Sequence, residues 1–262
     1  MTAQLSDKSS ASRSASSSQH SNAGFPHAFV LRVAASALWL ALSPPAAAEP
    51  RLPAMNLTYS VTWTGIYLGD ATLTLAPVGA NCYHYESKSD PIKLVQWFYG
   101  TPHELSEFCV ADGRVVPRHF EFVNPKSPED SFTLDFDAAA GKVRDGAGHV
   151  RDLPPNAQDR FGIQQAVRLW VVTHLAARKG ETVEFATVDD RHIRKFQFAL
   201  AGAQDVKTPA GSFHAVVLEE VGNPRKVLKF WLAPERDYMP VKVEQVRGAT
   251  SLKMVLLPPP KS

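Results

Sequence analysis

The segment from Asp159 to Gly180 constrains the fold more than any other, because it is the only long stretch with helical periodicity. Asp159 can accept hydrogen bonds from the free backbone amides of a first helical turn, and Gly180 can take the left-handed conformation that ends many helices. We therefore predict one main helix over residues 161–179. Its broad apolar stripe, which includes one histidine, consists of Ile163, Ala166, Val167, Trp170, Val171, His174 and Leu175.

Most of the remaining sequence alternates between apolar and polar residues, as strands with one buried face do. Residues 57–64, LTYSVTWT, are the clearest example, and turns containing glycine or proline separate further segments of this kind. A lone helix with a tryptophan and branched residues on one face needs a curved sheet to bury that face. We predict a mostly β fold, an antiparallel curved sheet or open barrel wrapped around the main helix, with Trp170 anchoring the helix against the sheet.

Four motifs follow one another in a characteristic order. They are LTYSVTWTGIYLGDATLTL near the start, DRFGIQQAVRLW at the predicted helix, the turn KTPAGSFHAV, and the closing hairpin FWLAPERDYMPVKVE. In this order they resemble the exported bacterial family of domain of unknown function 3108, and the resemblance covers nearly everything after Met55. It implies an exported, β-rich protein and brings no assigned activity or catalytic residue.

Residues 1–48 have the pattern of a disordered extension plus a signal peptide. After a serine- and alanine-rich stretch, Arg32 precedes the ten-residue apolar run Val33–Leu42, and Ala46-Ala47-Ala48 follow a Ser-Pro-Pro breaker. This is the order of a secretory signal that is cleaved after the last alanine. The run is too short to span a bilayer, and an uncleaved membrane anchor is the alternative. We predict a single β-rich domain over residues 49–262, located in the periplasm.

The two cysteines, Cys82 and Cys109, both lie in the predicted mature domain. An even number of cysteines in an exported protein is typical of a disulfide. If the strands that carry them pair antiparallel, the two cysteines lie near the same end, where a bridge is geometrically allowed. We predict a disulfide between them, and two buried thiols are the alternative.

The charge of the chain excludes nucleic acid as a partner. Residues 1–48 contain three of the 28 Lys and Arg residues and one of the 26 Asp and Glu residues, so the mature chain is neutral. A neutral chain with mixed signs lacks the counterion-release drive towards nucleic acid and has no polybasic membrane segment.

No catalytic, metal-binding or cofactor motif stands out. The segment His103–Glu107, HELSE, comes closest to a metalloprotease helix, but a glutamate stands where the second histidine belongs. Ser212 follows Gly211 ahead of a strand and does not fit a nucleophile elbow. We therefore predict no metal, no cofactor and no catalytic residue, and we favour a protein that is not an enzyme.

The aromatic residues give the best indication of function. A sheet curled around a helix can enclose an apolar cavity large enough for an acyl chain, as in periplasmic lipoprotein carriers, although the aromatics can equally fill a dry core. For Ile92–Tyr99, with three adjacent aromatics, we favour buried edge structure over a short helix at a barrel mouth. The candidate ligand-binding residues are Tyr59, Trp63, Trp97, Phe98, Trp170 and Trp231.

Three hypotheses for function follow from the sequence. The leading one is an exported, non-enzymatic periplasmic protein that binds a lipid or other hydrophobic ligand for the cell envelope. The alternative is an envelope scaffold or interaction protein that docks a partner protein through its sheet edge, and a weaker alternative is an uncharacterised hydrolase. An internal cavity favours the first hypothesis, a filled core with an exposed apolar edge the second, and a buried histidine–carboxylate pair at a cleft the third.

Overall fold

A computed structural model describes residues 50–223 and 225–259 of the 262-residue chain. The predicted extension and signal peptide, residues 1–48, therefore lie outside the described residues. Strands dominate the described part and form one 15-stranded sheet. The strands are β1 (Met55–Trp63), β2 (Ile66–Pro77), β3 (Cys82–Pro91), β4 (His103–Ala111), β5 (Arg114–Val123), β6 (Phe132–Asp137), β7 (Lys142–Asp145), β8 (Val150–Asp152), β9 (Ala157–Asp159), β10 (Thr182–Val188), β11 (Ile193–Thr208), β12 (Gly211–Val221), β13 (Lys226–Ala233), β14 (Met239–Arg247) and β15 (Thr250–Leu256). The helices are α1 (Lys93–Tyr99) and α2 (Ile163–Thr173), with short 3-10 turns η1 (Pro128–Asp130) and η2 (Pro234–Arg236).

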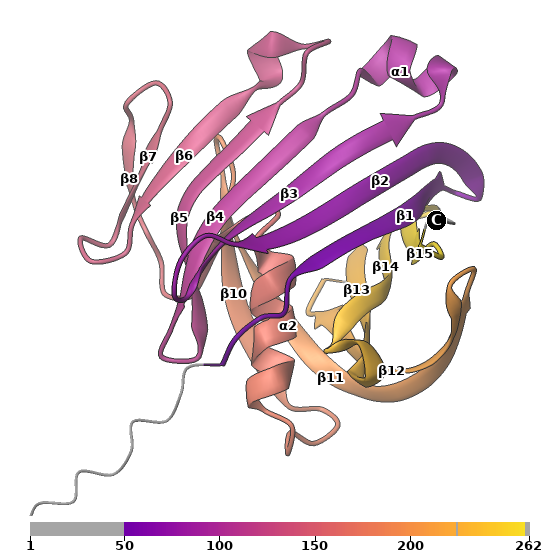
Figure 1. The fold of residues 1–262 in the computed structure, drawn as a ribbon. Helices are drawn as coiled ribbons and strands as arrows, with labels where there is room; N and C mark the ends of the chain where they lie inside the picture. Colours follow the sequence, from indigo (N-terminus) through magenta and orange to yellow (C-terminus); the bar gives the residue numbers. More distant parts are fainter. Residues whose placement is uncertain (1–49, 224, 260–262) are drawn as a thin grey trace, which may run out of the picture. The chain divides into compact units, whose positions relative to one another are not determined.

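Two antiparallel meanders make up the sheet (Figure 1). One runs from β1 outwards to β8, and the other returns from β10 to β15, which pairs with β1. The first and last strands therefore lie side by side in the middle of the sheet. Among the described strands, β9 and β10 form the only parallel pair, because the chain reaches β10 through α2 rather than through a hairpin.

The sheet is strongly curved, and α2 lies within the curve (Figure 1). The two ends of the sheet approach each other, since Arg151 in β8 donates from Nη2 to the carbonyl oxygen of Asp189, just after β10, at 2.9 Å. Gln158 in β9 also donates from Nε2 to the carbonyl oxygen of Val115 in β5 at 2.9 Å. The two end strands, β8 and β9, nevertheless do not pair with each other, so the sheet does not close. The domain is thus a barrel-like open sheet, in agreement with the predicted mostly β, curved architecture.

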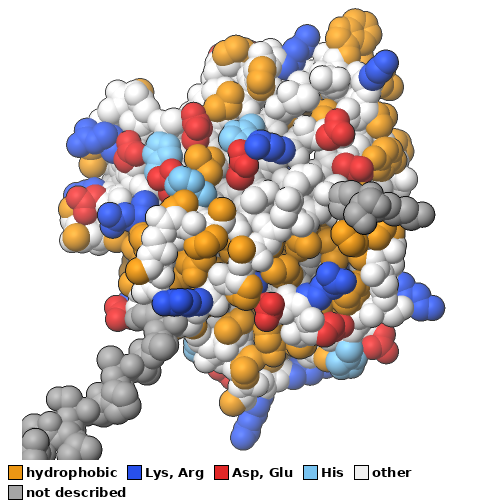
Figure 2. Space-filling model, in the orientation of Figure 1, with side chains coloured by type: hydrophobic (Ala, Val, Ile, Leu, Met, Phe, Trp, Pro, Cys, Tyr) orange, Lys and Arg blue, Asp and Glu red, His pale blue; other side chains and the backbone are white. Residues whose placement is uncertain are grey.

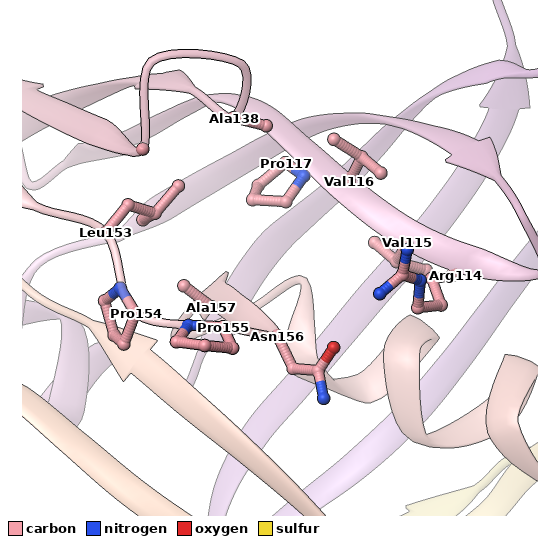
Figure 3. A pocket seen from close by; sticks show the side chains of 11 residues that line it. Arg114, Val115, Val116, Pro117, Ala138, Leu153, Pro154, Pro155, Asn156 and Ala157 are labelled. Atoms are coloured by element: carbon pink, nitrogen blue, oxygen red, sulfur yellow. The ribbon is translucent and has the colours of Figure 1, made fainter. Parts of the chain in front are cut away.

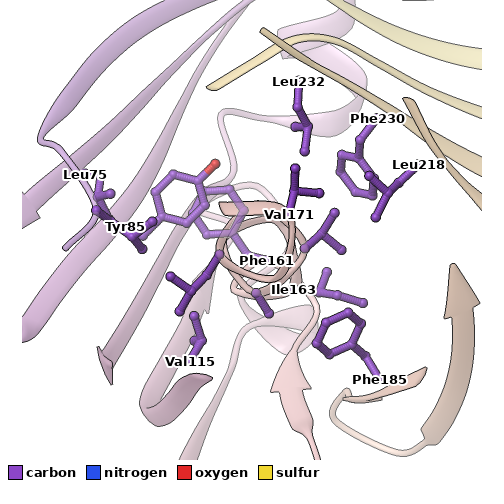
Figure 4. Close-up of a cluster of buried hydrophobic side chains, with 14 of the residues drawn as sticks. Leu75, Tyr85, Val115, Phe161, Ile163, Val171, Phe185, Leu218, Phe230 and Leu232 are labelled. Carbon is purple, nitrogen blue, oxygen red and sulfur yellow. The ribbon is translucent and has the colours of Figure 1, made fainter. Parts of the chain in front are cut away.

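Alternation along the strands decides which side chains enter the interior. In β2, Ala71, Leu73 and Leu75 are buried, whereas Thr72 and Thr74 between them are partly exposed. Apolar side chains from both meanders converge on α2 (Figure 4). Each fully buried aliphatic or aromatic side chain contributes roughly 1.5–3 kcal/mol to folding. Because side chains of both meanders pack around α2, this one helix occupies the centre of the core.

The predicted disulfide is present. Cys82 and Cys109 face each other directly across the β3–β4 ladder, and their sulfur atoms are bonded. The bridge lies where β3 begins, which is the end of that strand opposite to α1.

The prediction of one main helix over residues 161–179 is not confirmed. The described residues also contain α1, and α2 ends at Thr173. Thr173 Oγ1 donates to the carbonyl oxygens of Leu169 and Trp170 at 2.9 and 3.1 Å, and His174 Nδ1 donates to the Trp170 oxygen at 2.9 Å. These side chains give extra donors to the carbonyl oxygens of the last turn, where α2 ends.

Trp170 is not the anchor of α2. It is only partly buried, and Leu175, predicted to share its stripe, is 67% exposed. Val167 and Leu169 are fully enclosed instead, and α2 buries side chains around most of its circumference. The prediction assumed one apolar face against one sheet, whereas a sheet that curls around the helix covers several faces. The buried residues of α2 are Ile163, Gln165, Ala166, Val167, Arg168, Leu169 and Val171.

Candidate functional site

Half of the predicted ligand-binding aromatics belong to the interior. The Tyr59 hydroxyl donates to the carbonyl oxygen of Pro240 at 2.7 Å, and Trp231 Nε1 donates to Gln204 Oε1 at 3.1 Å. Both side chains are buried, and Trp170 is partly buried against the same core. The polar atoms of Tyr59 and Trp231 are thus bonded within the protein, and both side chains pack in the core.

The other half, Trp63, Trp97 and Phe98, lie on the surface at one end of the sheet. Trp63 pairs with Ile66 across the β1–β2 hairpin, and the start of β2 pairs with the end of β3, which leads into α1. Hydrophobic side chains gather at the upper right of the space-filling view, where Figure 1 places α1 (Figure 2). We call this surface the aromatic tip, and its exposed residues are Trp63, Ile66, Tyr67, Ile92, Leu94, Trp97, Phe98 and Tyr99.

A close backbone contact holds α1 at this end. The amide of Ile92 donates to the carbonyl oxygen of Leu68 at 2.9 Å, just before the helix starts. Gly69 lies beside this junction with φ +137°, and a Cβ there would come within 2.4 Å of the Asp90 carbonyl oxygen. Only glycine fits so close to the neighbouring strand. The end of the β2–β3 ladder therefore fixes the position at which α1 begins.

None of the seven residues of α1 is buried, so the prediction of buried edge structure for Ile92–Tyr99 is wrong. The alternative, a short helix, is what the structure contains. Three adjacent aromatics cannot all point to one side of a helix, so a short helix at this end leaves them exposed. A surface pocket of about 140 Å³ lies between α1 and the sheet and is lined in part by Leu68, Val95 and Tyr99. Leu94, Trp97, Phe98 and Tyr99 of α1 are exposed, whereas Val95 is partly buried.

A notch lies where the two ends of the sheet approach each other (Figure 3). It has a volume of about 320 Å³ between β5 and the connection from β8 to β9. Pro117, Pro154 and Pro155 line it, and proline offers no backbone donor. Arg114 and Asn156 are its polar side chains, too few to indicate a particular ligand.

A second cavity of about 240 Å³ adjoins the end of α2 and is lined by Trp170, Leu175, Leu200 and Tyr238, among others. Trp170 stacks on His174 with ring centroids 5.0 Å apart. This is where the structure brings the partly buried Trp170 into contact with open space. The cavity lies beside the filled core around α2 rather than inside it.

Asp159 holds the entry to α2, as the sequence predicted. Its Oδ1 accepts from the amides of Phe161 and Gly162, and its Oδ2 accepts from Ser106 Oγ at 2.6 Å. A Cβ at Gly162 would come within 2.6 Å of this carboxylate, so glycine is required there. Burial raises the pKa of Asp159 to about 6, although the three hydrogen bonds oppose this shift.

Arg168 is a buried cation that the sequence did not reveal. Its Nε donates to the Asp237 carbonyl oxygen at 3.0 Å and its Nη1 to Gln165 Oε1 at 3.3 Å, while Nη2 has no hydrogen-bond partner within the described residues. Burial lowers the pKa of this guanidinium. A helical stripe predicts one buried face only, so no sequence signal marked this position. Arg168 ties α2 to the turn that follows η2.

Histidines and carboxylates alternate in a row across the outer face of β3 to β6. His84 faces Glu107, which faces His119, which faces Asp135. The outer pairs are 3.0 and 2.7 Å apart, and all four side chains are partly exposed. The hydrolase hypothesis required a buried pair at a cleft, and this row does not supply one. No group of three or more His, Cys, Asp or Glu side chains in the described part of the chain is arranged to hold a metal ion.

Within the described residues, no helix is long and apolar enough to cross a membrane. Comparison with curated proteins finds no match. Among solved structures, the chain is similar to a beta-barrel-like protein of domain of unknown function DUF1849 from Brucella abortus, with 14% sequence identity and a TM-score of 0.51. The match covers 80% of this chain and 98% of that one. At this identity the likeness supports the barrel-like fold alone.

The family comparison covers most of the domain. The model of a protein family described as "Protein of unknown function (DUF3108)" matches residues 58–256. This range begins in β1 and ends with β15, so it includes the whole curved sheet, α1 and α2. The resemblance seen in the four sequence motifs is thereby confirmed, and the chain belongs to the DUF3108 family.

Proposed function

We propose that this protein is an exported, non-enzymatic component of the cell envelope that binds lipid at a membrane surface through the aromatic tip. The observation that carries the proposal is the exposure of α1, where Leu94, Trp97, Phe98 and Tyr99 are 63–72% exposed. Soluble proteins rarely leave several neighbouring large apolar side chains in water unless a partner or a membrane covers them.

The chemistry of the tip favours a lipid surface. Tryptophan and tyrosine carry an apolar body and a polar end, and they concentrate where a membrane meets water. Lys93 opens α1, and the helix contains no acidic residue, so nothing on it repels lipid phosphates.

The sheet edges are a weaker candidate for docking a partner protein. Edge strands β8 and β9 have three residues each, and such short edges offer few free backbone groups for an added strand. The membrane proposal agrees with the leading hypothesis that the ligand is a lipid. It differs in the place of binding, which is the protein surface and not an internal cavity. Export remains a prediction from residues 1–48, which agrees with an envelope role.

Sedimentation with vesicles of phosphatidylglycerol and phosphatidylcholine tests the proposal. We expect the wild type to bind. The Trp97→Ser/Phe98→Ser variant should need at least about tenfold more lipid for half-maximal binding, because two aromatic side chains no longer enter the bilayer. The matched control is Leu175→Ser/Val150→Ser, which removes two exposed apolar side chains elsewhere. Equal loss in both variants, or no binding by the wild type, would contradict the proposal.

A further inference from the structure

A cationic pocket lies at the same end of the sheet as the aromatic tip. Arg247 at the end of β14 pairs with Thr250, and Leu252 of β15 pairs with Trp63 at the tip. The pocket opens beyond these strands, between β11, β12, β13 and β14, and has a volume of about 580 Å³. Its lining residues are Arg194, Lys195, Phe196, Glu220, Asn223, Arg225, Lys226 and Arg247.

Positive charge is concentrated here in a chain that is nearly neutral as a whole. Five of the eight lining residues are cationic and one is acidic. Of the cations, Lys195 forms an ion pair with Glu184 outside the pocket at 3.2 Å. No ion pair within 4.0 Å is found for Arg194, Arg225, Lys226 or Arg247 among the described residues, and the attraction of Glu220 acts on Lys226. Three guanidinium groups therefore line the pocket without an ion-paired carboxylate.

The register of the sheet makes this concentration costly. Lys226 and Arg247 are direct partners across the β13–β14 ladder, and like charges in that position destabilise a sheet. The Lys226 ammonium lies 5.0 Å over the ring of Phe196. Burial lowers its pKa, Arg247 and Arg194 lower it further, and Glu220 opposes them. The Lys226 ammonium is thus partly desolvated and lies close to both like and opposite charges.

Glu220 offsets only part of the positive charge, through its attraction to Lys226. Its side chain is 6% exposed, one of its oxygens accepts from the amide of Leu228 at 3.1 Å, and burial raises its pKa. The pocket thus contains one carboxylate, together with four cations that form no ion pair within 4.0 Å among the described residues. An arrangement that keeps such repulsion in place is typical of a site prepared for a ligand, where strain in the free protein is relieved on binding.

We propose that this pocket binds a phosphate-bearing anion. Guanidinium groups present paired N–H donors that match phosphate oxygens, and Arg194, Arg225 and Arg247 supply three of them around one space. The volume falls in the range of ligand sites and exceeds what one phosphate needs, and Phe196 adds an apolar wall. The ligand class is thus a phosphorylated organic molecule, either free in solution or as the headgroup of a lipid.

The pocket shares no residue with the aromatic tip, so this inference does not rest on the proposed function. If the ligand is a lipid headgroup, both surfaces meet the same membrane, because they lie at the same end of the strands. If the ligand is soluble, phosphate binding is independent of the tip. Vesicle binding by the tip variants and phosphate binding by the pocket variants can therefore fail separately.

The test compares Arg194→Gln/Arg247→Gln with the control Arg118→Gln/Lys207→Gln, which removes two exposed cations elsewhere. Calorimetric titration of the full chain with inorganic phosphate measures the first arm. We expect binding that weakens with salt and is roughly tenfold to a hundredfold weaker in the pocket variant, with the control unchanged. In the second arm, vesicles with and without phosphatidylglycerol are compared at an intact tip. Loss of the phosphatidylglycerol preference in the pocket variant assigns a lipid headgroup, and an unchanged preference assigns a soluble ligand.

A stability measurement separates a binding role from a structural one. Arg247→Gln removes the like-charge pair with Lys226, so the ligand-free variant should melt at a higher temperature than the wild type while phosphate raises its melting temperature less. A lower melting temperature together with undiminished phosphate binding would overturn the proposal. Absence of phosphate binding by the wild type would overturn it equally.

Discussion

The core around α2 and the aromatic tip contain the same kinds of side chain in opposite environments. In the core, Phe161 and Tyr85 stack with centroids 4.0 Å apart, and they are 3% and 0% exposed. At the tip, the Trp97 and Phe98 rings lie 5.2 Å apart and are 70% and 63% exposed. Aromatic content by itself therefore does not indicate a cavity. The core pair contributes to folding, whereas the tip pair leaves its free energy of burial available for binding.

Charged groups differ between the core and the cationic pocket in a similar way. Asp159 in the core accepts three hydrogen bonds from the loop and strand around it. At the cationic pocket, Lys226 and Arg247 stand opposite each other without an ion pair within the described residues. Satisfied polar groups fix the position of α2, and uncompensated ones lie where a ligand can reach them.

Phe161→Ala should give the largest loss of stability. It removes a fully packed ring, and the lost transfer energy plus the cavity typically cost about 3–5 kcal/mol. Urea unfolding followed by circular dichroism measures this, with Phe98→Ala as the control from the tip. A loss below about 1 kcal/mol would show that the core is not as well packed as the contrast between core and tip requires.

Removal of the disulfide should cost nearly as much. Cys82 and Cys109 are 27 residues apart in sequence, and closing a loop of that size stabilises a protein by roughly 3–4 kcal/mol in the chain-entropy model. We expect the Cys82→Ala/Cys109→Ala variant and the reduced wild type to unfold at similarly lowered urea concentrations. The tip should still bind vesicles, because it lies at the other end of β3. If the variant loses vesicle binding together with stability, the core and the aromatic tip do not act independently.

The pH dependence of stability tests the burial of Asp159. Because its folded pKa of about 6 lies above the ordinary 3.8, the folded state binds the proton more tightly than the unfolded state. The contribution of this group is therefore most favourable below pH 3.8 and declines as the pH rises to about 6, by roughly 3 kcal/mol. Asp159→Asn should abolish this decline, and urea unfolding of both proteins between pH 4 and 7 isolates it. Parallel curves for the two proteins would contradict the prediction.

The sequence predicted the curved sheet, the disulfide and the capping role of Asp159, because alternation, cysteine number and helix-start chemistry are local signals. It did not predict how far the sheet would curl. Arg168 is consequently buried on what looks like the polar side of a helix, and Trp170, central to the apolar stripe, is only partly buried. The sequence did not predict the cationic pocket either. Arg194, Lys226 and Arg247 are distant in sequence, and the nearly neutral overall charge hides their convergence.

Trp97→Ala should have the smallest effect on stability, and for that reason it is the sharpest test of the contrast. An exposed side chain with few packing partners changes the free energy of unfolding by about 0.5 kcal/mol or less when truncated, whereas the same truncation in a core costs several times more. Urea unfolding of Trp97→Ala beside Phe161→Ala compares the two regions directly. If Trp97→Ala destabilises by 2 kcal/mol or more, about the value of a buried side chain, α1 is packed against the sheet and the tip is part of the core. If its stability is unchanged while vesicle binding falls, the tip contributes to binding and not to folding.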